Sequence, residues 1–146
     1  MMLALASDHA GYDYKEAVKP ILKELGIAFK DCGTFTNEST DYPDWAHRAC
    51  ESISKGECDR GILVCGTGIG MSIVANKHKD IRAAACESTT SARLSRQHNN
   101  ANVLALGGRV IGLESAKDII RTLLSTSFEG GRHERRVNRI HEITNL

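Results

Sequence analysis

The sequence predicts an α/β protein, and two features of the chain indicate this class. Short apolar runs alternate with longer amphipathic segments along all 146 residues, which is typical of a parallel sheet with helices on both faces. One apolar run, Ile62–Val64, is followed by glycines at alternate positions and then by helix-forming residues, a strand–turn–helix pattern common at ligand sites in such sheets. We therefore expect a Rossmann-like three-layer αβα sandwich, built as one domain over residues 1–146 around a five-stranded parallel sheet.

The first two expected strands enclose a helix. Leu3–Ala6 forms the first strand, and Ile27–Asp31 forms a weaker second one because Lys and Asp interrupt its apolar run. The helix between them has an apolar face made of Ala17, Val18, Ile21, Leu22 and Leu25. Pro20 lies within this helix and predicts a kink or a late restart, and Gly26 is expected to end it.

A polar loop and a second helix connect the second strand to the third. The loop covers Thr34–Thr40, and Asp41 is expected to cap the helix that follows. The inner face of this helix comprises Ala46, Ala49, Cys50 and Ile53. The third strand, Ile62–Val64, is continuously apolar, as expected for a strand buried on both faces, and it brings Cys65 to its carboxyl end.

Two more strands complete the predicted sheet. The fourth is expected at Ile81–Cys86, and after it a helix begins at Ser88 or Thr89 and runs to about residue 97. The fifth strand, Val103–Leu106, ends at two glycines. The clearest amphipathic helix of the chain follows, with apolar residues at helical spacing: Ala116, Ile119, Ile120, Leu123 and Leu124.

The tail from Arg132 to Leu146 is expected to be helical, although few of its residues are apolar. Val137, Ile140 and Ile143 form one narrow stripe along it. Because such a stripe is too small to hold the helix firmly on its own domain, we expect this C-terminal helix to pack on a partner subunit. A helix docked loosely on the surface is the alternative that the stripe alone leaves open.

Composition excludes several classes of protein. The net charge of +1 and the charged fraction of 25% give no general attraction to nucleic acid or to a membrane surface. No apolar run approaches the ~20 residues of a membrane span, and residues 1–6 are too short for a signal peptide, so we expect a cytoplasmic protein. An odd number of cysteines without a CxxC pair predicts reduced thiols, with neither a disulfide framework nor a zinc site: Cys32, Cys50, Cys58, Cys65 and Cys86.

The glycine turn predicts a small anion site rather than a nucleotide site. Residues 66–70 read GxGxG, one residue short of the dinucleotide pattern, and the chain has no P-loop motif. Backbone amides at such a turn attract an anionic oxygen and lower the pKa of a neighbouring thiol. Cys65 is therefore a candidate base that takes a proton from a carbon beside a carbonyl, although a cysteine at a strand end is often only buried packing.

Other polar groups lie near the ends of expected elements. Asp8 and His9 close the first strand, and His98 ends the fourth helix; a helix cap and a polar helix terminus are the plain alternatives. Arg132 and Arg136 are spaced i, i+4, so both face one side of a helix and suit a phosphate, although charges there are often only solvated. With Arg109 after the fifth strand, these groups describe a small phosphorylated substrate handled by a cysteine base.

Seven short motifs run from the first expected strand to the last helix. They are Ser7-Asp8-His9-Ala10-Gly11, Asp41-Tyr42-Pro43, Cys65-Gly66-Thr67-Gly68-Ile69-Gly70-Met71-Ser72, Ala75-Asn76-Lys77, Ser95-Arg96-Gln97-His98-Asn99, Asn102-Val103-Leu104-Ala105-Leu106-Gly107 and Glu129-Gly130-Gly131-Arg132-His133. In order and spacing they resemble the type B ribose-5-phosphate isomerases, whose wider family includes the galactose-6-phosphate and allose-6-phosphate isomerases. One branch of that family uses a glutamate base at the position of Met71; this chain resembles the cysteine branch.

The resemblance implies an aldose–ketose isomerase that interconverts D-ribose 5-phosphate and D-ribulose 5-phosphate through a cis-enediolate, with no metal and no cofactor. It implies three catalytic roles: a proton-transferring base at Cys65, hydroxyl proton shuttling at Thr67, and opening of the furanose ring at His98. It implies an anion hole made by the amides of residues 66–70 and the Asn99 side chain. The resemblance also implies that Asp8 and Tyr42 contact the sugar. It implies that four residues bind the phosphate: His9, Arg109, Arg132 and Arg136. The turn residues that contact the substrate are Gly66, Thr67, Gly68, Ile69 and Gly70.

The resemblance also implies a homodimer, with a tetramer as a further possibility, whose active sites lie between two subunits. The partner molecule is a phosphorylated sugar, with no nucleic acid and no membrane. Two alternatives stay open at this point. One is an isomerase of a six-carbon phosphosugar, and the other is a sensor of a phosphosugar or nucleotide without catalysis. The presence of both Cys65 and His98 disfavours the sensor.

Overall fold

The structure is a computed structural model that describes residues 1–146. Its centre is a parallel sheet of five strands in the order β2-β1-β3-β5-β4, so the sheet predicted from the sequence is confirmed. Every neighbouring pair of strands is parallel. The strands are β1 (Met2–Ser7), β2 (Ala28–Gly33), β3 (Arg60–Cys65), β4 (Ala83–Ala85) and β5 (Val103–Gly107).

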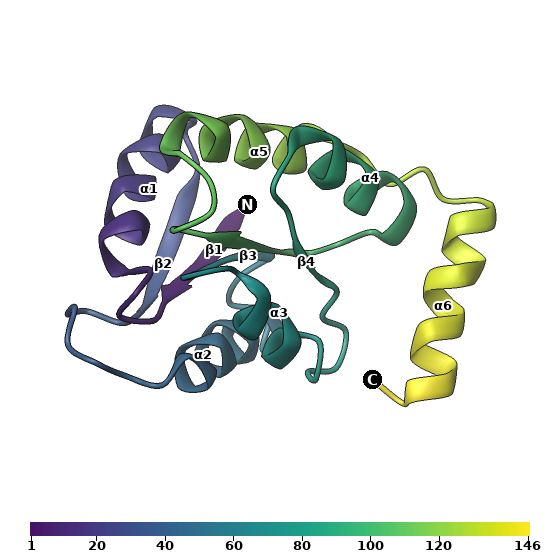
Figure 1. Cartoon of the computed structure of the whole chain (residues 1–146). Coiled ribbons are helices and arrows are strands. Elements are labelled where there is room, and N and C mark those ends of the chain that lie inside the picture. Colours follow the sequence, from purple (N-terminus) through teal and green to yellow (C-terminus); the bar gives the residue numbers. More distant parts are fainter.

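Helices cover both faces of the sheet, which makes the predicted three-layer sandwich (Figure 1). On one face lie α1, α4 and α5, and on the other lie α2 and α3, each face with its own apolar core. The sixth helix, α6, stands at the end of the molecule beside α4 (Figure 1). The bounds are α1 (Tyr12–Glu24), α2 (Tyr42–Ser54), α3 (Ile69–Ala75), α4 (Thr89–Asn99), α5 (Leu113–Ser125) and α6 (Arg132–Thr144).

The sequence of β3 is continuously apolar because this strand lies in the middle of the sheet, where both of its faces are covered. Because side chains alternate along a strand, Ile62 and Val64 enter the core beneath α1 and α5, whereas Leu63 and Cys65 enter the core beneath α2 and α3. All four are buried. The alternation places the Cys65 thiol on the α2–α3 side of the sheet, at the strand's carboxyl end.

Three local expectations need correction. Helix α1 runs through Pro20 without a late restart, because Val18 and Leu22 are anchored in the core and Pro20 lies on the exposed side. Asp41 holds the N-cap position of α2, but its side chain makes no capping hydrogen bond. Strand β4 is shorter than Ile81–Cys86 because it is an edge strand that pairs only with β5, over three residues.

Helix α6 packs mainly on α4 and buries only part of its apolar stripe. Val137 is buried, whereas Ile140 and Ile143 are 44% and 62% exposed. A cavity of about 380 Å³ lies between α6 and β4. The packing of α6 on a partner subunit therefore stays a prediction, with an apolar surface available for it. None of the helices has both the length and the apolar character that crossing a bilayer requires.

Candidate active site

The carboxyl ends of β1 and β3 bring Asp8 and Cys65 to the same edge of the sheet. The Asp8 amide donates to the Val64 carbonyl over 3.2 Å, directly before Cys65. Gly11 permits this approach, because a Cβ at that position would lie 2.4 Å from the Val64 carbonyl oxygen. One oxygen of the Asp8 carboxylate accepts a hydrogen bond from the Gly11 amide at 2.8 Å. The buried carboxylate is thus fixed with its second oxygen without a partner in the chain.

The Cys65 thiol lies at the mouth of the glycine turn. Its exposed fraction is 5%, and its sulfur accepts a hydrogen bond from the Gly68 amide at 3.1 Å. A cysteine that only fills space in the core would also be buried. It would not need a backbone donor aimed at its sulfur. Such a donor stabilises the thiolate form, which is the form that acts as a base.

Two glycines let the turn lie flat against the end of β5. Gly68 has a φ of +80°, and a Cβ on it would lie 3.1 Å from the Leu106 carbonyl carbon. A Cβ on Gly107 would lie 2.8 Å from Thr67. The Thr67 side chain is exposed and accepts from the Ile69 amide at 3.3 Å. The amides of Gly68 and Ile69 thus already have partners within the turn.

Tyr42 forms a wall beside this turn. It is the first residue of α2, and its ring lies against Gly70, where a Cβ would come within 2.9 Å of the ring. The side chain is 40% exposed. Gly70 is therefore the residue that lets an aromatic ring close one side of the site.

Arg109 is held next to the turn by backbone hydrogen bonds. Its amide donates to the Gly66 carbonyl at 3.0 Å, and the Gly108 amide donates to the Cys65 carbonyl at 2.9 Å. The Arg109 Nη1 lies 3.6 Å from where a Cβ on Gly66 would be. A guanidinium therefore stands beside the first glycine of the turn, where it can bind an anionic substrate group.

His9 is oriented by the loop before α2. Its Nδ1 lies 3.1 Å from the Thr40 carbonyl and 3.2 Å from the Thr40 amide. Trp45 in turn donates from its indole Nε1 to the Thr40 hydroxyl at 3.0 Å. These contacts leave the Nε2 of His9 without a partner in the chain and available for a ligand.

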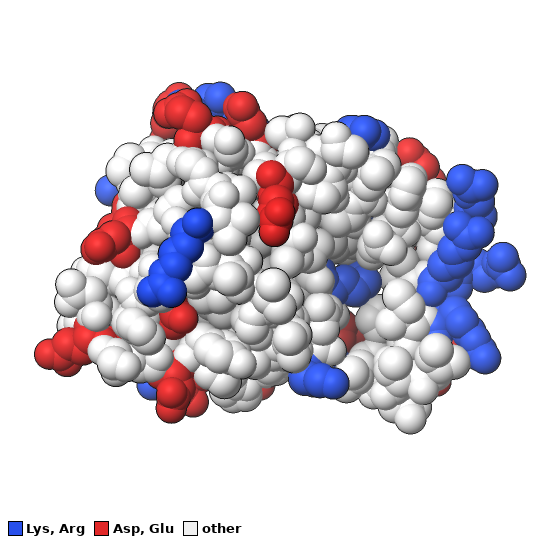
Figure 2. All heavy atoms as spheres, viewed as in Figure 1, with Lys and Arg blue, Asp and Glu red and all other residues white.

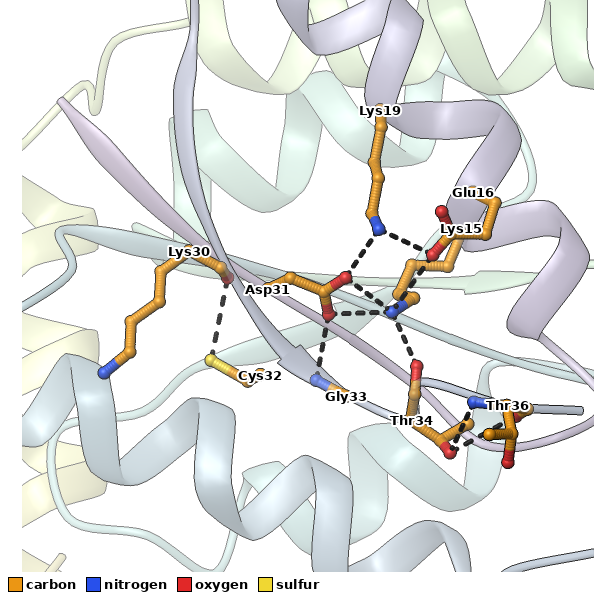
Figure 3. Close-up of polar contacts among 9 residues, drawn as sticks. All are labelled: Lys15, Glu16, Lys19, Lys30, Asp31, Cys32, Gly33, Thr34 and Thr36. Carbon is orange, nitrogen blue, oxygen red and sulfur yellow. Dashed lines mark hydrogen bonds and ion pairs between the residues drawn. The ribbon is translucent and has the colours of Figure 1, made fainter. Parts of the chain in front are cut away.

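A buried ion pair supports the start of the same loop (Figure 3). Lys15 is fully buried and donates to Asp31 at 2.7 Å and to the Thr34 carbonyl at 2.7 Å. Burial alone raises the pKa of the Asp31 carboxyl, but hydrogen bonds from Lys15 and Lys19 and from the Gly33 amide outweigh it and hold that pKa below its usual value. This pair was not predicted from the sequence. Its signal was the spacing of Lys15, Val18 and Leu22, which places the lysine on the buried face.

The remaining predicted residues lie elsewhere in the chain. His98 and Asn99 end α4, which leads to the amino end of β5, and there the Asn102 carbonyl accepts from the Gly61 amide at 3.0 Å. Gly61 is the second residue of β3 and Cys65 is its last, so the amino end of β5 and the thiol are about 13 Å apart along the strand direction. Within one chain, His98 and Asn99 are therefore at the opposite edge of the sheet from the thiol.

The His98 imidazole is stacked on that of His133, with ring centroids 4.3 Å apart and an interplanar angle of 9°. His133 is buried, and its Nε2 lies 3.5 Å from Glu129. Burial, with His98 and two arginines nearby, lowers the pKa of His133. No role for His133 was predicted from the sequence, although His133 follows Glu129 at i, i+4 spacing.

Arg132 and Arg136 are exposed on α6, in a region where Figure 2 shows Lys and Arg side chains gathered. With His98, Asn99 and His133 they form a second group, which we call the α4–α6 group. The first group comprises a thiol, amide donors, a carboxylate and Arg109, and we call it the thiol group. The thiol group suits proton transfer beside an oxyanion, whereas the α4–α6 group offers an imidazole and two cations.

Comparison with known proteins gives a consistent result. A family model described as Ribose/Galactose Isomerase matches residues 3–140. The chain is 48% identical to ribose-5-phosphate isomerase B of Escherichia coli over 141 residues, which is 97% of this chain and 95% of the relative. The solved ribose-5-phosphate isomerase B of Clostridium thermocellum superposes with a TM-score of 0.97 at 51% identity, covering 99% of this chain and 98% of the other. The enzyme of Thermotoga maritima gives a TM-score of 0.94 at 55% identity, with 97% of each chain covered.

Proposed function

The chain belongs to the ribose/galactose isomerase family and is an isomerase, and we propose that residues 1–146 form one domain that interconverts D-ribose 5-phosphate and D-ribulose 5-phosphate. The observation that carries this proposal is the Cys65 sulfur, which accepts a hydrogen bond from the Gly68 amide at 3.1 Å. It combines a base with preorganised backbone donors, and isomerisation of an aldose to a ketose needs both.

In the proposed reaction, the Cys65 thiolate takes the proton from C2 of the open-chain aldose and returns it to C1. The electrons of the C2–H bond form a C1=C2 double bond and the π electrons of the C1 carbonyl move to its oxygen, which gives a cis-enediolate. The turn amides that have no partner within the turn, together with the Asn99 side chain, hold the negative oxygen, and Thr67 shuttles hydroxyl protons. Because the chain's own thiol and donors supply base and oxyanion stabilisation, the proposed step needs neither a metal nor a cofactor.

Substrate binding and ring opening use the remaining groups. The free Oδ2 of Asp8 accepts from sugar hydroxyls, and Tyr42 packs beside the sugar. The phosphate is bound by His9 through its free Nε2 and by Arg109, with Arg132 and Arg136 on the far side. His98 protonates the ring oxygen as the furanose opens. These roles are the ones that the family resemblance implies, and the positions of Asp8, His9, Tyr42 and Arg109 around the glycine turn support their part of the proposal.

We propose that the active site is completed by a second copy of the chain in a homodimer. The thiol group and the α4–α6 group lie at opposite edges of one sheet, so they meet only when the α4–α6 group of one subunit faces the thiol group of another. Apolar side chains are available for such an interface. Ile69 and Ile73 on α3 are 55% and 56% exposed, and Ile140 and Ile143 are exposed on α6. Pairing of dimers into a tetramer is the alternative assembly.

All five thiols are free and buried, which fits a reducing compartment, and we propose a cytoplasmic location on this ground. Within the same reaction class, a six-carbon phosphosugar is the second candidate substrate. Tyr42 is the residue relevant to that choice, because its ring closes one side of the site against Gly70.

The test is an isomerase assay on purified protein with ribose 5-phosphate, allose 6-phosphate and galactose 6-phosphate, each in the presence of a chelator. We expect ketose formation from ribose 5-phosphate. Cys65→Ser should lower kcat by about 100-fold or more with little change in KM. Cys58→Ser removes a buried thiol outside the proposed site and serves as the matched control. Equal activity of Cys65→Ser and Cys58→Ser would refute the assignment of the base, and turnover of a hexose phosphate alone would replace the proposed substrate.

A further inference from the structure

Three side chains of the α4–α6 region have the composition of a metal-binding site. His98, Glu129 and His133 each offer one ligand atom, and these three atoms lie within 4.8 Å of one another. Two imidazoles and one carboxylate are a common protein ligand set for Zn²⁺, with water in the fourth position. The proposed reaction gives this set no function as a whole, since it uses His98 alone.

The backbone holds the three residues together although they are distant in sequence. The Glu129 amide donates to the Gln97 carbonyl at 3.1 Å, which fixes the segment before α6 onto the end of α4. The His133 amide donates to the Gly130 carbonyl at 3.0 Å and thereby starts α6. The ligand positions are therefore set by the fold rather than by chance approach of exposed side chains.

Only small movements separate the present arrangement from a coordinated one. Two ligand atoms of a tetrahedral Zn²⁺ lie about 3.3 Å apart, given Zn–N distances of about 2.0–2.1 Å. The His133 Nε2 and the Glu129 carboxylate are already 3.5 Å apart. The two imidazole rings are stacked, so one ring has to turn about its Cβ–Cγ bond before both nitrogen lone pairs point at one ion. His98 is only half-buried and Glu129 is exposed, so neither side chain is enclosed by the core.

We propose that His98, Glu129 and His133 form an inhibitory site for a divalent transition-metal ion such as Zn²⁺. Imidazole nitrogen selects such ions over Mg²⁺ and Ca²⁺, which prefer oxygen ligands. An ion bound there occupies a ring nitrogen of His98 and removes it from proton transfer. The inhibitory consequence rests on the proposed function, because it requires His98 to open the sugar ring. The binding itself does not depend on that function.

Binding is tested first, by calorimetric titration of Zn²⁺ into metal-free protein. All proteins carry Cys65→Ser, which removes the thiol as a competing ligand. We expect one equivalent to bind, and Glu129→Gln to weaken that binding at least tenfold. Glu134→Gln removes an exposed carboxylate one residue from His133 and should leave Zn²⁺ binding unchanged. Titration with Mg²⁺ in place of Zn²⁺ should show no binding. No binding, or equal affinity in Glu129→Gln and Glu134→Gln, overturns the site.

Inhibition is tested second, with Cys65 intact. The concentration of Zn²⁺ that halves turnover of ribose 5-phosphate should rise at least tenfold in Glu129→Gln but not in Glu134→Gln, and a chelator should restore activity. Glu129 is exposed and has no place in the proposed reaction, so metal-free turnover of Glu129→Gln should match that of the wild type. Inhibition of equal strength in both variants overturns the inhibitory role. Failure of the proposed function is a separate result, namely no turnover by the metal-free wild type.

Discussion

The Gly68 amide donates a hydrogen bond to the Cys65 sulfur over 3.1 Å, and it does so from a backbone conformation that few residues other than glycine adopt. Gly68 has a φ of +80°, which turns its N–H back toward the end of β3. The same residue lies against the backbone of Ala105 and Leu106. One glycine therefore both aims the donor and allows the turn to pack on β5.

Gly68→Ala is expected to lower both kcat and the free energy of unfolding. The left-handed φ and a Cβ only 3.1 Å from the Leu106 carbonyl carbon force the turn to shift. We expect a loss of about 1–3 kcal/mol in the free energy of unfolding and a fall in kcat of at least tenfold, because the amide leaves the sulfur. Urea denaturation and steady-state kinetics measure the two effects.

Gly112→Ala is the matched control for this substitution. Gly112 has a φ of −74°, and no atom lies within 4 Å of a Cβ built there. Stability and kcat should both stay close to the wild type. If Gly68→Ala behaved in the same way, the turn would not hold the donor as we describe.

Arg132→Ala is expected to raise KM for ribose 5-phosphate while leaving kcat nearly unchanged. A guanidinium that binds the phosphate contributes to ground state and transition state alike, and a hydrogen bond to a charged group is worth about 1.5–3 kcal/mol. KM should therefore rise by about 10-fold or more. Arg139→Ala provides the control, because Arg139 is also exposed on α6 but pairs with Glu142 at 3.1 Å. Equal KM values for the two variants would remove Arg132 from the phosphate site.

The order and type of the strands and helices could be predicted from the sequence because each depends on local patterns. Strand β3 has a continuous apolar run and helix α5 has apolar residues at helical spacing, and both were predicted correctly. The length of β4 could not be predicted, because it depends on which partner strand an edge strand finds. Asp41 has a residue type that favours caps, but the capping bond depends on a side-chain rotamer that no local pattern determines.

Some contacts of the candidate site could likewise be predicted from the sequence, and others could not. Cys65, Asp8 and Arg109 each follow a strand, and parallel strands end at one edge, so their proximity could be predicted. His98 also lies next to a strand in the sequence, but it precedes β5 rather than following it, which places it at the other edge. The His98–His133 stack is a contact between residues far apart in the chain. It depends on how α6 docks on α4, which the narrow stripe of α6 does not specify.

The buried pair of Lys15 and Asp31 predicts a change in acid stability. Because the folded pKa of Asp31 lies below its unfolded value, the pair stabilises the protein fully above about pH 4, the unfolded pKa, and this contribution is lost as the pH falls through the folded value. Asp31→Asn should therefore be less stable than wild type at pH 7, by about 2–3 kcal/mol. Its stability should also fall less steeply below about pH 4.

Urea denaturation at a series of pH values measures this difference. Glu57→Gln is the control, because Glu57 pairs with Lys30 at the surface, where both side chains are 49% exposed. We expect that variant to follow the wild-type profile closely. Parallel profiles for Asp31→Asn and wild type would contradict the assigned pKa direction.

Mixing two inactive variants tests whether the active site is shared between subunits. Cys65→Ser inactivates the thiol group and His98→Asn inactivates the α4–α6 group, so each homodimer should be inactive. A heterodimer has one site that carries both substitutions and one site that carries neither. Random exchange of subunits should therefore restore about a quarter of wild-type activity, since half of the dimers are mixed and each has one intact site of two. Activity is measured after co-refolding equal amounts from urea. No recovery, with mass spectrometry confirming mixed dimers, would place His98 and Cys65 in the same subunit's site and contradict the composite arrangement.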